Sequence, residues 1–445
     1  MRPLTVAPVG RERYMSFFDQ GVYAPAPDAP IMPAIVALHA EEAATIHAVR
    51  TLLAHAPRCR LADLRRFDDR LAAHLEGLRV AGDCGWRLCE AALDNPTAGT
   101  VFTLAVRAIE EKQDQRVEAL AVLVQAAPEL RDGFLSAFGW LERERLQGVV
   151  VGLLGSSDAA RRTVGVAACG MHRVDGGNAA DFWLRDEAPA VRAAALRGAG
   201  ESGSIYLQSA CSAALKHDPD ADCRFWAAWS TVLLGGRGAA VDALVREGEG
   251  EGLNPLRGFR LAMQALDVAS AHAVLEYVAR DPGQLPKLVS GAGLVGDPMY
   301  VPWLLGHMAN NETTRLAGEA VSLITGIDLE QLDFQRDRPA DFIAGPTDDP
   351  DDPRVDMDVD EDLPWPDVGK IDKWWSANGN RFQKGIRYFM GAPVTREHCI
   401  EVLKNGYQRQ RILAAHYLCL LEPGTPLFNT SAPAWRQQRL LAEMK

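Results

Sequence analysis

The stretch Gly296-Asp-Pro-Met-Tyr-Val-Pro-Trp-Leu-Leu-Gly-His-Met-Ala-Asn-Asn-Glu-Thr-Thr-Arg-Leu-Ala-Gly-Glu-Ala-Val-Ser-Leu-Ile-Thr-Gly326 decides the expected fold. Its first half has the signals of a helix start. Asp297 suits the N-cap, and Pro298 suits the first helical position, where a missing N–H costs nothing. Apolar side chains then recur at helical spacing from Val301 to Met308 and predict one buried stripe.

The second half of this stretch predicts a second helix. Asn310-Asn311 breaks the first helix, and a new apolar stripe runs from Leu316 to Ile324. Gly326 is the expected C-cap. Two helices with one stripe each cannot bury both stripes alone, so the unit predicts neighbours of the same kind.

Short Ala-rich segments with a basic residue recur upstream of this unit. The basic residues are Arg161, Arg192, Arg224, Arg257, Lys287 and Arg315, separated by 31, 32, 33, 30 and 28 residues. An internal period of about 30 residues is typical of stacked helix pairs. We therefore expect an all-α chain, built as an α-solenoid with an N-terminal helical cap and a small C-terminal helical module.

Composition divides the chain into four expected parts: an N-terminal arm and helical cap (1–97), the repeat solenoid (98–326), an acidic linker (327–369) and a basic, aromatic-rich helical module (370–445). Residues 341–362 hold ten Asp or Glu against one Arg, whereas residues 363–445 hold twelve Lys or Arg against six acids. The contrast predicts that the acidic segment, solvated and extended, folds back onto the basic module. Ser431 is the expected N-cap of the last helix.

The overall charge argues against a nucleic-acid track. The formal net charge is -12 and the sequence pI is about 5.4, whereas a phosphate track needs a basic stripe. No stretch approaches 18 uncharged apolar residues, and the N-terminus lacks a signal-peptide core, so we expect a cytoplasmic protein with no membrane contact. Eight cysteines without a C-x-x-C pair predict neither disulfides nor a zinc site.

Two short motifs resemble ligand sites but depart from them. Gly291, Gly293 and Gly296 match G-x-G-x-x-G, yet Asp297-Pro298 starts a new repeat at once, so a glycine-rich turn between helices is expected. Asp356-x-Asp358-x-Asp360 opens like a calcium loop but lacks its glycine and its final glutamate. With no nucleophile–base pair in view, we expect no cofactor, no metal and no enzyme activity.

The recurring basic residues allow two interpretations. They form a ladder on a concave binding face, or, as is commoner, each binds the Asp-containing turn of the adjacent repeat. The tryptophans are likewise either core residues or contact residues. The candidate partner-binding residues are Arg192, Arg224, Arg257, Arg315, Trp374, Trp375, Arg409 and Arg411.

Parts of the sequence resemble known families. Gly-Asp-Pro-x-x-Val-Pro-Trp-Leu from Gly296 and Thr-Arg-Leu-Ala-Gly-Glu-Ala from Thr314 resemble the short HEAT repeats of phycobilisome-lyase-like proteins. Further segments resemble an uncharacterised bacterial family of HEAT-repeat proteins encoded near type VI secretion genes, beside spike and tip proteins. They are Asp341-Phe-Ile-Ala-Gly-Pro-Thr-Asp-Asp-Pro-Asp-Asp, Leu363-Pro-Trp-Pro, Gly391-Ala-Pro-Val-Thr, Gly406-Tyr-Gln-Arg-Gln-Arg and the run from Pro426 to Arg436.

This resemblance implies an accessory factor of type VI secretion. We expect a non-enzymatic scaffold or adaptor whose concave surface holds another protein, such as an effector or spike component. Two alternatives stay open at this point. A lyase-like HEAT enzyme requires a deep pocket with converging polar groups, and nucleic-acid binding through the C-terminal basic patch requires a steep salt dependence.

Overall fold

The computed structural model describes residues 31–249, 254–340, 342, 345, 358 and 360–444. Helices dominate these residues, which confirms the all-α class. The strands among them are two residues long and form two antiparallel pairs. β1 (Gln335–Arg336) pairs with β2 (Trp365–Pro366), and β3 (Tyr388–Phe389) pairs with β4 (Ala392–Pro393).

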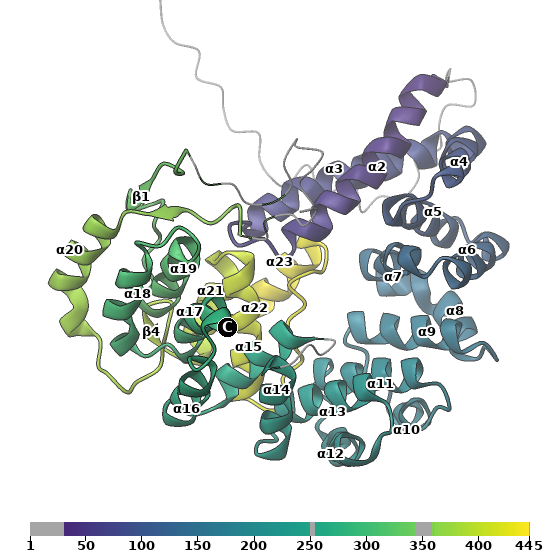
Figure 1. The fold of residues 1–445 in the computed structure, drawn as a ribbon. Coiled ribbons are helices and arrows are strands. Elements are labelled where there is room, and N and C mark those ends of the chain that lie inside the picture. The colour runs from purple at the N-terminus through teal and green to yellow at the C-terminus, as the bar shows by residue number, and fades with distance from the viewer. Residues whose placement is uncertain are drawn as a thin grey trace, which may run out of the picture.

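One row of helices follows the curve of the molecule, each helix contacting the next (Figure 1). In chain order it consists of α2 (Pro33–Leu53), α5 (Ala98–Glu110), α7 (Arg131–Trp140), α9 (Ala159–Met171), α11 (Pro189–Glu201), α13 (Ala221–Leu233), α15 (Pro255–Ala265), α17 (Leu285–Val295) and α19 (Thr314–Thr325). Asp158, Asp220 and Asp267 cap the helices that follow them by accepting a backbone N–H three residues on. These caps explain where the repeated units restart.

A second set of helices packs against this row. It consists of α3 (Leu61–Val80), α4 (Gly82–Ala91), α6 (Asp114–Ala126), α8 (Arg143–Leu154), α10 (Asn178–Leu184), α12 (Gln208–His217), α14 (Ala239–Glu249), α16 (Val268–Val278) and α18 (Val301–His307). Short 3-10 turns join several of these helices: η1 (Ala92–Asp94), η2 (Pro128–Leu130), η3 (Ile205–Leu207), η4 (Pro282–Gln284) and η5 (Pro298–Tyr300). From α5 to α19, helices of the row and of the second set alternate along the chain.

Three C-terminal helices lie inside the curve of the row, namely α21 (Arg396–Asn405), α22 (Gln408–Leu421) and α23 (Ala434–Glu443) (Figure 1). Helix α20 (Val368–Asn378), which the short η6 (Gly379–Arg381) follows, lies outside the curve and contacts α18. Helix α22 contacts α13 and α15, and α23 contacts α3. Within the expected C-terminal helical module (370–445), α22 and α23 therefore pack against earlier helices, whereas most residues of α20 are exposed or half-buried.

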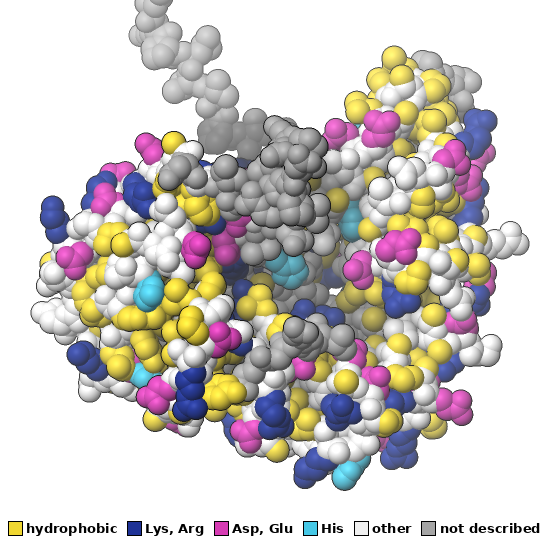
Figure 2. All heavy atoms as spheres, in the orientation of Figure 1, with side chains coloured by type: hydrophobic (Ala, Val, Ile, Leu, Met, Phe, Trp, Pro, Cys, Tyr) yellow, Lys and Arg dark blue, Asp and Glu magenta, His cyan; other side chains and the backbone are white. Residues whose placement is uncertain are grey.

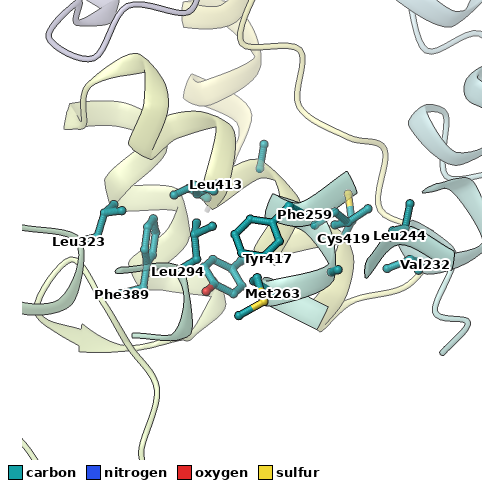
Figure 3. Close-up of a cluster of buried hydrophobic side chains, with 14 of the residues drawn as sticks. Val232, Leu244, Phe259, Met263, Leu294, Leu323, Phe389, Leu413, Tyr417 and Cys419 are labelled. Carbon is teal, nitrogen blue, oxygen red and sulfur yellow. The ribbon is translucent and has the colours of Figure 1, made fainter. Parts of the chain in front are cut away.

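Apolar side chains of α22 explain this placement. Leu413, Tyr417 and Cys419 are buried. Figure 3 shows Tyr417 between Phe259 and Met263 of the row on one side and Leu294 on the other. Burying large side chains of this kind contributes about 1.5–3 kcal/mol each. The helix is therefore held by the same hydrophobic core that holds the row.

The two glycines at the ends of the 296–326 unit allow the chain around β3 to pass close to the row. Gly296 and Gly326 both have left-handed backbones, with φ of 73° and 75°, and each ends a helix of the row. A Cβ on Gly296 would lie 2.2 Å from the carbonyl oxygen of Tyr388, and one on Gly326 would lie 2.5 Å from that of Met390. The chain around β3 therefore crosses the ends of α17 and α19 at backbone distance.

Polar contacts join the first helices to the far end of the row. The Arg60 guanidinium lies 2.9 Å from a carboxylate oxygen of Asp328, and the Tyr407 hydroxyl donates to the same carboxylate at 3.1 Å. The backbone N–H of Gln408 donates to the carbonyl of Cys59 at 2.8 Å. The C-terminal helices thus connect the beginning and the end of the row, and the curve closes on itself.

Two local expectations were wrong. Gly291 and Gly293 lie inside α17 and not in a turn. A Cβ on Gly293 would lie 2.8 Å from the Cα of Ala320, so the glycine lets α17 approach α19 closely. Ser431 does not cap the last helix, because α23 begins at Ala434 after Pro433. At the ends of the expected linker (327–369), Leu329 and Trp365 are buried, and most of the segment expected to be extended, 341–362, lies outside the described residues.

Candidate functional site

Three arginines form a ladder along α9, α11 and α13. Arg192 binds both carboxylate oxygens of Asp218, at 2.8 and 2.9 Å, and also donates to the carbonyl of Asp186. Arg162 binds Asp186 in the same bidentate way, and Arg224 donates to the carbonyl of Asp218. For Arg192 this confirms the structural interpretation. The equivalent residue in α9 is Arg162 and not Arg161, which instead pairs with Glu118.

We expect this ladder to stabilise the stacking of the repeats at neutral pH. In a double-mutant cycle of Arg192→Ala and Asp218→Ala, the coupling should be about 1–2 kcal/mol, because the pair is bidentate and mostly buried. The hydrogen bond from Arg192 lowers the pKa of Asp218. A lowered pKa stabilises the folded state above the unfolded value, about 3.9, and that contribution disappears as pH falls through the folded value.

The coupling is measured by urea unfolding at pH 7 and at pH 3. It should be present at pH 7 and smaller at pH 3. A coupling that is equal at both pH values would contradict the ladder's assigned charge state.

The acidic segment contacts both the row and the C-terminal helices. Arg315 of α19 lies 2.7 Å from Asp358, and Arg409 of α22 lies 2.8 Å from Asp360 and 3.1 Å from Glu319. The Asp360 contact agrees with the expected fold-back onto the basic module. Most of residues 341–357, including Asp356 of the calcium-like motif, lie outside the described residues.

The other candidate residues are mainly structural. Arg411 is fully buried and donates to the carbonyl of Leu403 at 2.7 Å and to the side chains of Gln408 and Gln437. Trp374 and Trp375 are partly buried and pack near the ring of Phe382. Partner binding by these residues stays a prediction.

A cavity of about 620 Å³ lies between the row and the C-terminal helices, and we call it the central cavity. Helices α2, α5, α7, α11, α13, α15 and α22 contribute to its wall, together with the segment 427–433. Its charged and titratable lining residues are His47, Arg50, His55, Arg173, Arg197, Glu201, Arg257, Arg260 and His416. Arginine therefore dominates the wall, and Glu201 is its one carboxylate among the described residues.

The carboxylate of Glu201 is already engaged. Burial alone would raise its pKa, but Arg173 and Arg197 lower it to about 2. Arg173 lies 2.6 Å and Arg197 2.8 Å from its oxygens. Arg50 is likewise paired, with the buried Asp68. Among the arginines of the wall, Arg257 and Arg260 have no carboxylate within ion-pair distance in the described part of the chain.

Burial lowers the pKa values of these two arginines. It lowers the pKa of Arg257 to about 10, with Arg197 adding to the effect. Burial also lowers the pKa of Arg260, and burial with Arg257 and Arg260 lowers that of His55. Arg257 is held over the rings of Trp226 and Trp229, at 5.3 and 5.5 Å from their centroids. Arg257 was a candidate residue from the sequence, whereas only the fold shows that Arg260 and His55 line the same cavity.

The cavity wall also holds a hydroxyl–imidazole contact. Nε2 of His47 lies 2.7 Å from Oγ of Ser136, and that hydroxyl donates to the carbonyl of Gly133. The histidine therefore donates to Ser136 through Nε2–H, and its buried Nδ1 has no partner. Burial lowers the pKa of His47 to about 4. A histidine of such low basicity, with its Nε2 proton facing the hydroxyl, is not placed to remove the proton from Ser136. The hydrogen bond instead connects α2 to α7.

Helix α2 carries an exposed apolar stripe on the side opposite its buried face. We call this the α2 stripe, and it consists of Ile31, Ile35, Leu38, Val49 and Leu52, with exposed fractions from 36% to 74%. The spacing of Ile35, Leu38, Val49 and Leu52 places them on one side of the helix. Glu42 and Thr45 lie between the first pair and the second, and Ile31 lies just before the helix, which begins at Pro33. Figure 2 shows hydrophobic atoms gathered on the projecting end of α2 at the upper right. A helix that is apolar on both sides is usually covered on both.

The described residues were also compared with the requirements of a metal site and of a membrane span. No group of three His, Cys, Asp or Glu there could hold a metal ion, and the eight cysteines are free. No helix in those ranges is long and apolar enough to span a bilayer. Comparisons with protein-family models, curated proteins and solved structures found no match for the chain.

Proposed function

We propose that this chain is a non-enzymatic scaffold or adaptor, a HEAT-type solenoid that binds another protein through the α2 stripe. The observation that carries the proposal is the exposure of these apolar side chains along one helix. Exposed apolar side chains gathered on one side of a helix are a common mark of a protein-binding surface. An amphipathic helix laid along the stripe would bury it by the usual mode of helix recognition.

The proposed partner is a type VI secretion effector or spike component. This part rests on the resemblance of the segments between Asp341 and Arg436 to the secretion-associated HEAT family. The protein would act in the cytoplasm, before its partner is loaded. The concave side of the row was the expected binding face, but α22 and residues 427–433 cover it. The proposal therefore places the partner on the outside of α2.

We expect Leu38→Glu and Leu52→Glu to lower capture of the partner at least tenfold. Each change puts a charge into the proposed apolar contact, while these exposed positions leave the free energy of unfolding within about 0.5 kcal/mol. Capture is measured by pull-down with the spike and effector proteins encoded beside the gene. The matched control is Val151→Glu on α8, another exposed apolar position.

The chain's own N-terminal segment is the competing occupant of the stripe. Residues 1–30 precede Ile31 directly and contain Phe17 and Phe18. If this segment covers α2, deleting residues 1–29 raises capture, and the Glu variants have no effect on it in the full chain. Undiminished capture by both Glu variants, in the full and the shortened chain, would refute docking on α2.

A further inference from the structure

We propose that the central cavity binds a small phosphate-bearing anion through Arg257 and Arg260. The two arginines are three residues apart on α15, so they lie on the same side of the helix. Both line the cavity, and both are partly buried. His55 lines the cavity with them, and burial together with both arginines lowers the pKa of its imidazole.

The start of α15 adds to the positive field. The helix begins at Pro255, and its N-cap residue Asn254 makes no side-chain cap bond. Asn254, Pro255 and Leu256 all line the cavity, so the N-terminus of the helix faces it. Free backbone N–H groups and the helix dipole favour an anion at this end. Two guanidinium groups and a helix N-terminus suit the several oxygens and the double charge of phosphate.

The nearby carboxylates that the structure describes do not neutralise this pair. Glu201 acts on Arg257 electrostatically, but Arg173 and Arg197 hold its oxygens. Glu319 and Asp360 act on Arg260 from a distance, but both bind Arg409. Holding two cations near each other away from bulk water is costly unless an opposite charge joins them. A bound anion supplies that charge.

The remaining wall sets the size and character of the ligand. A cavity of about 620 Å³ falls within the usual range for small-molecule sites, roughly 300–1,000 Å³. The wall also contains apolar and aromatic side chains from several elements, namely Phe102, Trp140, Trp229, Leu256, Ile412 and Phe428. Such a wall accepts an organic body beside the charged group. The ligand class is therefore a phosphorylated small molecule of at most nucleotide size.

Isothermal titration of the full-length protein with ADP and with inorganic pyrophosphate tests the site. We expect saturable 1:1 binding that weakens as salt rises. Arg257→Gln and Arg260→Gln should each weaken it roughly tenfold to a hundredfold, the usual worth of a charge-assisted hydrogen bond. The matched control, Arg280→Gln, removes an exposed arginine at the end of α16 and should bind as the unaltered chain does. Circular dichroism checks that each variant is folded.

The two probes separate the parts of the ligand. ADP binding tighter than pyrophosphate means that the apolar wall holds the organic body, and equal affinity means that the phosphate alone is recognised. No saturable binding of either probe overturns the proposal, as does equal affinity in the Arg257, Arg260 and Arg280 variants. The variants on α2 lie on the opposite side of that helix, so failure here and failure of the scaffold proposal are distinguishable.

The neighbouring acidic loop provides a second test. Gly248-Glu-Gly-Glu-Gly252 directly precedes α15 in the sequence, so Glu249 and Glu251 are the chain's own competing anions. In a protein with Glu249→Gln and Glu251→Gln, affinity for pyrophosphate should change less than tenfold. Binding that occurs only in this variant would identify the loop as the native occupant and overturn the proposal of a free ligand.

Discussion

Replacing Asp68 with Ala is expected to lower the free energy of unfolding by about 3–5 kcal/mol, because it leaves Arg50 buried without its partner. Asp68 is fully buried and forms an ion pair with Arg50. Its second oxygen accepts the backbone N–H of Ala434 at 2.6 Å. Arg50 also donates to the carbonyls of Ser431 and Ala432, at 3.1 and 3.0 Å. This cluster therefore joins α2, α3 and the start of α23.

Urea unfolding measures this loss, and the next residue supplies the control. Asp69 is exposed and pairs with Arg65 one turn away, so Asp69→Ala should change stability by less than about 0.5 kcal/mol. Replacing the whole pair with Arg50→Met and Asp68→Leu should recover much of the loss, since no buried charge is left alone. Equal small losses for Asp68→Ala and Asp69→Ala would show that the cluster does not hold the C-terminal helix.

Gly296→Ala is the second change with a large expected effect, a loss of about 2–5 kcal/mol. A left-handed backbone costs a residue with a Cβ roughly 1–2 kcal/mol. The new Cβ would also meet the carbonyl oxygen of Tyr388 at 2.2 Å, and such overpacking costs about 1–3 kcal/mol. The N–H of Tyr388 donates to the Gly296 carbonyl at 2.8 Å, so the segment cannot move away without losing that bond.

Gly238 separates the two costs. Its backbone is also left-handed, with φ of 57°, but a Cβ there would meet nothing within 4 Å. Gly238→Ala should therefore lose only the backbone term, about 1–2 kcal/mol. The difference between the two variants, measured by thermal or urea unfolding, reports the contact between α17 and the β3 segment. Equal losses would mean that this contact contributes nothing to stability.

The repeated units were predictable because their signals are local. Pro298, Gly326 and the apolar spacing between them act within a few turns of helix, and the structure places helix starts and ends close to the expected positions. Local signals also explain why the sequence named Arg161 as the ladder residue of α9 when it is Arg162 that binds Asp186. Arg161 and Arg162 are adjacent, and only the position of Asp186 on the next repeat selects Arg162.

The placement of the C-terminal helices was not predictable in this way. Arg436 donates to the carbonyls of Gly139 and Leu141, which are almost 300 residues earlier in the chain. Basic charge and aromatic content suggested a terminal helical module, whereas Arg387 and Arg436 donate to backbone carbonyls of the row and Tyr417 is buried in the core. Contacts of this range leave no periodicity in the sequence.

The central cavity is likewise formed by residues that are far apart in the sequence. Its cations come from α2, α11 and α15 and from the segment after α9, so no short motif contains them. Arg257 was named because it recurs with the repeat, but its tryptophan neighbours and Arg260 give it a different environment from that of Arg192. One repeated position thus serves stacking in one unit and faces a cavity in another.

Cleavage between the row and the C-terminal helices tests the central claim most directly. A protease site placed in residues 346–357 divides the chain without touching the described contacts. The two fragments should stay together on gel filtration at low and at high salt. Apolar side chains and buried hydrogen bonds join them, and salt screens mainly interactions between exposed charges. Separation of the cut protein into two folded fragments would contradict it.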